Sequence, residues 1–577
     1  MGSSSFRLRV ALIVITMVLS VFGARLFQLQ GIDPQAYAAR AAAAGLVHLK
    51  LPAKRGLIVG RNGTKLARSV AGLMIVADPK MTSPHAEQIA HILADRLHLD
   101  YFQTVSRLSM PNSRFQYIAR RVPSTQATSV MDAVDRAGYH GLYTRNDPMR
   151  VYPQHDVAAN LVGFLGASGA PAAGLEQTFN TLLAGKNGHD TYEVGDGNRI
   201  PLGENTEVKP VNGKALHLTI DSDAQWYAQR LLRNAVHQVH AKSATAVALD
   251  SRTGQVLTLA DYPTYDANKG SQSPENEWTS RGLADTYEPG SVEKVLTMSA
   301  LINQGLVTPH TKLSVPGSYP VDGRVIHDYW PHGRDPLTLT GVIAKSSNIG
   351  TAMAAEKIGS VKMAHYLAEF GLGQKVPVGM PGQTAGVLPP GNTWTHLTHS
   401  EIAFGQGLSV NALQMAAAVN TVANHGVYVT PSLVRGRTTT SSGQQVGSAT
   451  SKTHRVVSAK TASKVARMME MVVTEGAGTA PMAAIQGYRV SGKTGTAQEV
   501  GGTCHCYSEG GIDVSFAGFA PSDKPRFTVY VVIKHPQGAA SGGGTAGPVV
   551  RQLLSYLLQK YSVPPTGTPP AHLPVQW

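Results

Sequence analysis

Cysteine and charge are both scarce in this chain. Its 577 residues include two cysteines, and charged residues make up 15% of the total. The cysteines stand together as Cys504-His505-Cys506. A disulfide between them is allowed outside the cytoplasm, although a ring closed across one residue is tight and strained, so their oxidation state stays open. A metal site needs more ligands than this stretch offers, and we expect no metal there.

A second group of metal-type ligands is equally incomplete. His327, Asp328 and His332 lie close together in the sequence, but Trp330-Pro331 and Gly333 beside them indicate an ordinary loop. We therefore expect no metal and no cofactor in this protein.

Acidic residues are outnumbered, which raises the question of a nucleic-acid partner. The formal net charge is +14 and the isoelectric point is about 9.6. The lysines and arginines are scattered, however, and the chain has no basic run with interleaved aromatic residues of the kind that binds nucleic acid. Attraction to anionic lipid headgroups and anionic wall polymer explains the charge more simply, and we expect no nucleic acid.

One long hydrophobic run is present, at the N-terminus. Residues 10–24 are fifteen residues without a charge, fewer than the ~20 that a membrane-spanning helix needs. Including the apolar residues up to position 29 gives spanning length, with Arg25 reaching toward the outer interface. Arg7 and Arg9 precede the run, so the chain is expected to have its N-terminus in the cytoplasm and everything after the run outside.

A cleaved signal peptide is the competing interpretation of this run, because the length of its apolar part also fits one. Phe22-Gly23-Ala24 is a poor cleavage site, and we favour an uncleaved anchor.

Ser291 and Lys294 lie three residues apart at the start of an apolar stretch. Residues 295–301 follow with helical periodicity, so the spacing predicts a hydroxyl and an amine on one face of a helix. A serine in the first turn lies near the positive end of the helix dipole, and Gly290 lets backbone and substrate approach closely. The pair fits a nucleophile and its base, although alone it also fits an ordinary helix start.

Two further short strings follow in the chain order that serine–lysine acyl-transfer enzymes use. They are Ser346-Ser347-Asn348 and Lys493-Thr494-Gly495. Taken singly, the first fits a helix cap and the second an edge strand with a glycine where backbones crowd. Together with Ser291 and Lys294, the three strings indicate acyl-transfer chemistry.

With these motifs the sequence resembles the penicillin-binding proteins, and its flanks resemble the class B peptidoglycan transpeptidases. The resemblance covers roughly residues 10–555. The length, the single anchor and the string from Lys493 to Gln498 are most similar to the division-specific, FtsI-type branch. Further strings that carry the resemblance begin at Arg55, Gly174, Leu218, Asp250, Phe404 and Ser515.

The resemblance implies an α+β fold, in which a transpeptidase domain with an antiparallel sheet covered by helices stands on an extended N-terminal pedestal. Residues 203–214 have linker composition and mark the boundary. We therefore divide the chain into a cytoplasmic N-terminus (1–9), a transmembrane anchor (10–29), a non-catalytic pedestal of the dimerisation type (30–210), a transpeptidase domain (211–562) and a Pro-rich tail (563–577).

Charged residues of the pedestal are harder to interpret. By resemblance, Arg55, Arg150 and Glu176 join its segments, but solvated surface roles fit equally well. Residues 57–59 are expected to form a short strand that enters an Asn62-Gly63 turn. The family usually has an acidic residue just before this turn sequence, whereas this chain has Gly60.

Local patterns in the transpeptidase domain predict its main elements. The domain should open with a strand and a helix, continue with a hairpin, and close with two adjacent strands and a helix that begins with proline. The tail should be extended or disordered. The expected ranges are 215–220 and 224–241 for the first strand and helix, 245–249 and 255–259 for the hairpin, 514–519 and 527–533 for the late strands, and 548–561 for the last helix.

The motifs suggest roles in acyl transfer. Ser291 is expected to be the nucleophile, and Lys294, desolvated beside the cation of Lys493, the base that activates it. Ser346 would relay protons to the leaving amine. Asn348 would orient Lys294 and bind the substrate amide.

The third motif is expected to bind the substrate. The strand through Lys493, Thr494 and Gly495 would pair with the substrate backbone, and its cation and hydroxyl would hold the terminal carboxylate. By resemblance, the backbone amides of Ser291 and Thr496 form the oxyanion hole.

The resemblance also implies substrate and partners. The substrate is the D-Ala-D-Ala end of a peptidoglycan stem peptide, and β-lactams should acylate Ser291 as mimics. The inner membrane, a membrane glycan polymerase and divisome proteins are the implied partners. Alternatives are an elongation-specific transpeptidase, a D,D-carboxypeptidase, a serine β-lactamase, against which the pedestal and anchor argue, and a non-enzymatic division scaffold, which the complete set of motif residues disfavours.

Overall fold

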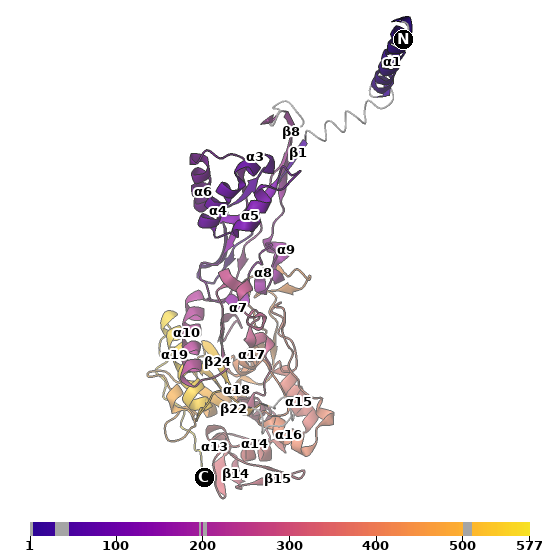
Figure 1. Ribbon diagram of the computed structural model, residues 1–577. Coiled ribbons are helices and arrows are strands. Elements are labelled where there is room, and N and C mark those ends of the chain that lie inside the picture. The colour runs from indigo at the N-terminus through magenta and orange to yellow at the C-terminus, as the bar shows by residue number, and fades with distance from the viewer. Residues whose placement is uncertain (1–3, 29–45, 196–197, 200–204, 500–510) are drawn as a thin grey trace. The chain divides into compact units, whose positions relative to one another are not determined.

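The computed structural model describes residues 4–28, 46–195, 198–199, 205–499 and 511–577. Cys504 and Cys506 lie outside these residues, so the structure does not address their oxidation state. The chain forms two compact units, each assembled from separate stretches (Figure 1). The first unit comprises Met1–Lys54, Ala71–Met149 and Gly185–Gly213, and the second comprises Arg55–Val70, Arg150–Ala184 and Lys214–Trp577.

Helix α1 (Ser4–Phe27) contains the hydrophobic run. Among the described residues, its segment Phe6–Phe27 is the one helix long and apolar enough to cross a membrane. Arg25 lies in its last turn. From Phe6 to Phe27 its side chains are exposed, as expected of a helix whose apolar surface is to be covered by lipid.

The first unit is built on a three-stranded antiparallel sheet with the order β5-β4-β6. Helices α4 (Ala86–Leu97), α5 (Tyr101–Leu108) and α6 (Ser124–Arg136) pack with it around a small core of their own. A separate antiparallel ribbon joins the first and last stretches of the unit. The strands are β4 (Gly72–Ala77), β5 (Gln116–Pro123) and β6 (Leu142–Asn146) in the sheet, and β1 (Leu46–Leu51), β8 (Gly188–Gly195) and β10 (Thr206–Val208) in the ribbon.

The second unit contains a five-stranded antiparallel sheet with the order β13-β12-β24-β23-β22. Helices α10 (Ser222–Gln238) and α19 (Gly547–Lys560) cover one face, and α17 (Ala412–Ala423) covers the other (Figure 1). Every residue of β12 is buried because both faces are covered. The strands are β12 (Ser243–Asp250), β13 (Val256–Tyr262), β22 (Ser491–Gln498), β23 (Ile512–Ala520) and β24 (Phe527–Lys534).

These elements confirm most local predictions for this unit. The hairpin, the adjacent late strands and the closing helix with its early proline form close to their expected ranges. The first strand is shorter than expected: only Leu216–His217 forms β11, which pairs in parallel with β2 (Ile58–Val59). The strand ends early because Thr219 bonds the Leu433 carbonyl of another segment, and Asp221 caps α10.

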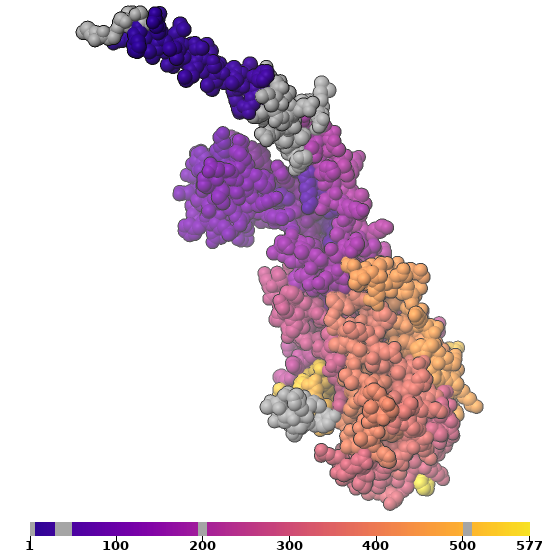
Figure 2. All heavy atoms as spheres, turned by 90° about the vertical axis from the view of Figure 1, so that its right-hand side faces the viewer, coloured from indigo at the N-terminus to yellow at the C-terminus, as the bar shows by residue number. Residues whose placement is uncertain are grey.

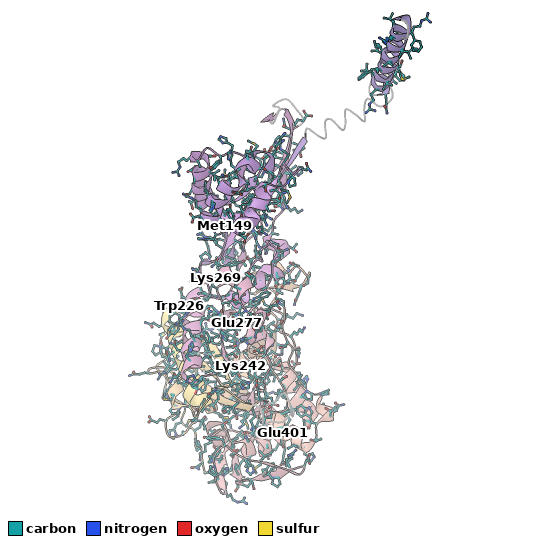
Figure 3. All side chains as sticks on the ribbon, in the orientation of Figure 1. Met149, Trp226, Lys242, Lys269, Glu277 and Glu401 are labelled. Atoms are coloured by element: carbon teal, nitrogen blue, oxygen red, sulfur yellow. The ribbon has the colours of Figure 1, made fainter. Side chains whose placement is uncertain are left out.

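A helical side of the second unit carries two of the three motifs. In Figure 3 the label of Trp226 marks α10 beside the sheet, and the label of Glu401 marks the helical side. The helices of this side are α12 (Lys294–Asn303), α13 (Leu339–Ala344), α14 (Asn348–Ala355), α15 (Ser360–Glu369), α16 (His396–Ala403) and α18 (Ala459–Glu470).

The charges at Arg55, Arg150 and Glu176 form a buried ion-pair cluster in the second unit. Glu176 is fully buried and accepts from Arg55 Nε at 2.5 Å and from Arg150 Nε at 2.6 Å. Two stretches of chain that are distant in sequence meet there, so these residues join segments and are not solvated surface charges.

The segment around Gly60 forms as expected, and its surroundings show what a larger residue at this position would meet. The expected strand and turn form, since β2 pairs with β3 (Lys65–Val70) and Gly63 has a φ of +85°. A Cβ at Gly60 would lie 2.4 Å from the Ser222 hydroxyl and 3.2 Å from the Ile220 carbonyl. A larger residue at this position therefore requires the Ser222 hydroxyl to shift.

Candidate active site

Ser291 lies in a tight turn directly before α12. The turn is a 3₁₀ helix over Gly290–Val292, and α12 begins at Lys294. We expected Ser291 in the first turn of the helix, and it lies just before that turn. Gly290 has a φ of +54°, and a Cβ there would lie 2.6 Å from the Thr496 carbonyl oxygen. Glycine is required for both reasons, and it brings the Ser291 turn against β22.

Lys294 is fully buried and is bonded to the second motif. Its Nζ donates to the Ser346 carbonyl and to Asn348 Oδ1, both at 2.7 Å. Burial lowers the pKa of its ammonium to about 7, and the nearby carboxylates of Asp328 and Glu293 oppose the shift. Much of this amine is neutral at physiological pH, so it can accept a proton from a hydroxyl.

Lys493 reaches the same serine from the sheet. It is fully buried, and its Nζ donates to Ser346 Oγ at 2.8 Å and to the Thr494 carbonyl at 3.0 Å. Burial lowers the pKa of Lys493 well below its usual value, and the charge of Lys294 adds to the effect. Two amines thus bind the same serine. Lys294 donates to the carbonyl of Ser346, and Lys493 donates to its hydroxyl.

Ser346 holds an uncommon backbone conformation at this junction. Its φ is +61°, in the left-handed region that L-residues other than glycine rarely adopt. It lies between the end of α13 and the start of α14, whose N-cap is Ser347, with Oγ accepting from the Gly350 amide at 2.8 Å. The capping alternative therefore applies to Ser347, and it leaves Ser346 free to face the lysines.

Asp328 supports the second motif. The sequence did not reveal this role. The buried carboxylate of Asp328 accepts from Ser347 Oγ at 2.7 Å, from the Ile349 amide at 3.1 Å and from the Asn348 amide. His332 Nε2 bonds the same carboxylate at 3.1 Å. A carboxylate at the N-terminus of α14 complements the helix dipole and fixes Asn348 toward Lys294. The signal available was the short distance in sequence between Asp328 and the motif, which we interpreted as an ordinary loop.

The third motif lies on β22, the last strand of the sheet. Lys493 and Thr494 are buried, whereas Thr496 is exposed. A Cβ at Gly495 would lie 2.1 Å from Ser515 Oγ, which confirms the expected glycine where chains crowd. An edge strand of this kind can pair with an extended peptide backbone.

One cluster has ligand types that suit a metal. Single ligand atoms of Glu499, Asp513 and His535 all lie within 4.8 Å of one another. The ammonium of Lys534 lies 3.0 Å from Glu499 Oε1 and 3.9 Å from Asp513 Oδ2. A cation of the protein itself already balances these carboxylates, so the group is an ion-pair network. In the other cluster, Asp328 bonds the second motif and His332 bonds Asp328.

Comparisons with known proteins agree with this geometry. The Penicillin binding protein transpeptidase domain matches residues 244–555, and the Penicillin-binding Protein dimerisation domain matches residues 50–218. The penicillin-binding protein PbpB of Mycolicibacterium smegmatis is 34% identical over 100% of this chain and 93% of its own length. The peptidoglycan D,D-transpeptidase FtsI of Escherichia coli is 31% identical over 96% of this chain and 91% of its own length.

Solved structures share the fold. Penicillin binding protein 3 of Mycobacterium tuberculosis, complexed with aztreonam, has 31% identity and a TM-score of 0.70, covering 92% of this chain and all of that one. A peptidoglycan synthetase from Bifidobacterium adolescentis has 29% identity and a TM-score of 0.71 with the same coverage.

Proposed function

The chain belongs to the penicillin-binding proteins, and from this premise we propose that it is a membrane-anchored serine D,D-transpeptidase that crosslinks peptidoglycan stem peptides. The observation that carries the proposal is the meeting of Lys294 and Lys493 at Ser346, together with the packing of the Ser291 turn against β22, the strand that carries Lys493. Three motifs far apart in sequence are thereby brought into one region, and each supplies a function that acyl transfer needs.

Acylation begins at Ser291. Its Oγ attacks the carbonyl carbon of the penultimate D-Ala while its proton passes to the neutral Nζ of Lys294. The tetrahedral oxyanion is stabilised by the backbone amides of Ser291 and Thr496. When the intermediate collapses, the C–N bond to the terminal D-Ala breaks, and the leaving nitrogen takes a proton from Ser346 Oγ, which receives one in turn from Lys493 Nζ, its hydrogen-bond donor.

Deacylation reverses these transfers. The amine of a second stem peptide attacks the ester carbonyl and loses its proton through the same groups, the new amide forms, and Ser291 Oγ regains its proton. A water molecule in place of the amine would give a trimmed stem and D,D-carboxypeptidase activity.

Substrate binding uses β22 as a template. The stem peptide extends the sheet at its edge, and its terminal carboxylate lies against Lys493 and Thr494. Bringing an anion to the buried Lys493 opposes the lowering of its pKa, so the bound substrate restores the charge that burial disfavours. This coupling favours ligands that carry a carboxylate, as penicillins do.

The division septum is the proposed site of action. Support comes from the likeness to FtsI over nearly the whole chain and from the single apolar helix, which would anchor the protein in the inner membrane with the N-terminus inside. A membrane glycan polymerase and divisome proteins are the proposed partners. Depletion should produce filaments, whereas rounded cells would favour the elongation-specific alternative.

The nucleophile assignment is tested by labelling the full-length protein with a fluorescent penicillin. Ser291→Ala should abolish covalent labelling while the thermal midpoint stays close to that of the unmodified protein. Ser299→Ala is a matched control on the same region of chain, because Ser299 Oγ donates to the Val295 carbonyl within α12. Undiminished labelling of Ser291→Ala would refute the assignment. Crosslinked products from stem-peptide donors and acceptors would separate transpeptidation from trimming.

A further inference from the structure

The tail, residues 563–577, is extended, as expected, and it packs along the second unit to reach the helical side. After α19 it runs to β17 (Asp335–Thr338), where Gln576 forms an antiparallel bridge with Leu337. The Trp577 amide donates to the Pro336 carbonyl at 3.0 Å. In Figure 1 the C mark lies beside α13 and β14 (Lys312–Val315), and Figure 2 shows the yellow chain end at the lower edge of this unit.

The tail is bonded to the residue that begins α13. Thr338 is the N-cap of this helix, and its Oγ1 accepts from the Gly341 amide at 3.0 Å. The Thr338 amide donates to the Val575 carbonyl at 3.0 Å, and its hydroxyl donates to the Pro574 carbonyl at 2.5 Å. The start of α13 is therefore fixed by the tail through both backbone and side chain.

A second link joins the tail to the motif itself. The carboxylate of Asp335 accepts from Gln576 Nε2 at 2.8 Å and from Lys345 Nζ at 3.1 Å. Lys345 immediately precedes Ser346, whose carbonyl and hydroxyl bind the two active-site lysines. One buried carboxylate thus connects residue 576 to the residue next to the active site.

The sequence of α13 is adapted to this contact. A Cβ at Gly341 would lie 1.9 Å from the Val575 carbonyl oxygen. Glycine inside a helix is less favourable than alanine because it loses more backbone freedom on folding. The helix bears this cost where the tail touches it, so the contact is a built feature of the fold.

The other end of the tail is fixed near β22. The Ala571 amide donates to Glu470 Oε2 at 3.0 Å, and Arg489 Nη2 pairs with Glu470 Oε1 at 2.6 Å. Arg489 Nη1 also donates to Thr568 Oγ1 at 2.9 Å. Arg489 stands two residues before Ser491, where the strand that carries Lys493 begins.

We propose that the tail is a positioning element of the active site, holding the helix that leads into Ser346 in register with the strand that carries Lys493. Val575 and Gln576 are positioning residues that act through Gly341, Thr338 and Asp335. The expected effect on acylation rests on the proposed function. Loosening α13 would let Ser346 move relative to both lysines, and a displacement of 1 Å in such a site can cost about a hundredfold in rate.

The first experiment removes residues 572–577 from the full-length protein, which leaves the bonds to Glu470 in place. The second-order rate constant for acylation by a fluorescent penicillin should fall by about tenfold or more. Hydrogen–deuterium exchange of residues 339–348 should become faster, while exchange of β12 should not. A merely structural loss would lower the thermal midpoint without changing the acylation rate of the folded protein.

The second experiment substitutes Gly341→Ala. In the full chain the new methyl group displaces Val575, so acylation should slow as it does after truncation. In the truncated chain the same substitution should cause no further loss, because the space is empty and alanine favours the helix. Gly359→Ala is the matched control, since a Cβ at Gly359 has no neighbouring atom within 4 Å among the described residues.

Three results would overturn the proposal: an unchanged acylation rate after truncation, unchanged exchange of residues 339–348, or losses from Gly341→Ala and truncation that add together. If the unmodified full-length protein is not labelled by penicillin at all, the proposed function fails instead. The exchange measurements then decide the role of the tail alone, because they require no chemistry at Ser291.

Discussion

Lys493 Nζ lies 2.8 Å from Ser346 Oγ, and the carbonyl of the same serine accepts from Lys294 Nζ at 2.7 Å. Ser346 therefore separates two amines that are both fully buried. Two buried ammonium groups near each other repel, because water does not screen their charges. The pair of lysines therefore favours carrying one proton fewer than two lysines in water would carry. The titration of this pair leads to the first two predictions.

Acylation should depend on pH through Lys294. The base must be neutral to accept the Ser291 proton, and the pKa of Lys294 is lowered to about 7. The rate constant for acylation by penicillin should thus rise with pH through this region and level off above it. Stopped-flow measurements from pH 5 to 9 test this expectation. A flat profile would show that Lys294 is not the group that takes the proton.

Stability should depend on pH with a definite sign. The pKa of Lys294 is about 7 in the folded protein and about 10.4 in an unfolded chain. Between these values the unfolded state binds more protons, so this lysine makes the free energy of unfolding increase as the pH rises from 7 to 10. Lys493 contributes with the same sign.

Lys294→Met is the variant that isolates this contribution. It should flatten the increase in the free energy of unfolding between pH 7 and 10. The variant should be stabilised most at the lower end of that range, because there the unfolded chain keeps the lysine charged while burial in the folded protein opposes the charge. Urea unfolding at a series of pH values measures both. A steeper slope in the variant would contradict the assignment.

Asp328→Asn should damage the site without removing any motif residue. The substitution keeps the size of the side chain but removes the charge that binds Ser347 Oγ and the amides at the start of α14. A hydrogen bond to a charged group contributes about 1.5–3 kcal/mol, and we expect a loss of stability of that order together with slower labelling. Asp132→Asn, on an exposed face of α6, serves as a control that should change neither quantity.

Glu176→Gln should affect stability and not chemistry. It leaves the guanidinium groups of Arg55 and Arg150 in a buried place without a balancing charge, which typically costs about 3–5 kcal/mol. The thermal midpoint should fall clearly, while the folded protein is acylated at the normal rate. Glu369→Gln, at an exposed pair with His454, should lower stability by less than about 1 kcal/mol. Equal effects of the two substitutions would argue against the cluster as a structural joint.

Local sequence patterns predicted much of this fold. Two apolar runs joined by a short turn located the β12–β13 hairpin, and a proline located the start of α19, because both signals depend on neighbours in the chain. The ordered motifs predicted which residues the structure brings together at the site. Family likeness supplied the order of the motifs, which no local rule contains.

Other features were beyond prediction because they depend on contacts between distant segments. Asp328 looks like any loop acid until α14 is placed against it. The tail has the composition of a disordered segment, and its docking depends on Thr338, Asp335 and Gly341, more than two hundred positions away. The contact between Gly60 and Ser222 likewise joins segments that are distant in the sequence.

The left-handed backbone at Ser346 has a practical consequence for mutagenesis. Serine already holds a φ of +61°, which disfavours L-residues by about 1–2 kcal/mol, and alanine would bear the same cost. Glycine tolerates that conformation freely. Ser346→Ala is consequently the cleaner chemical deletion, and comparing it with the glycine variant separates what the oxygen does from what the bend of the chain requires.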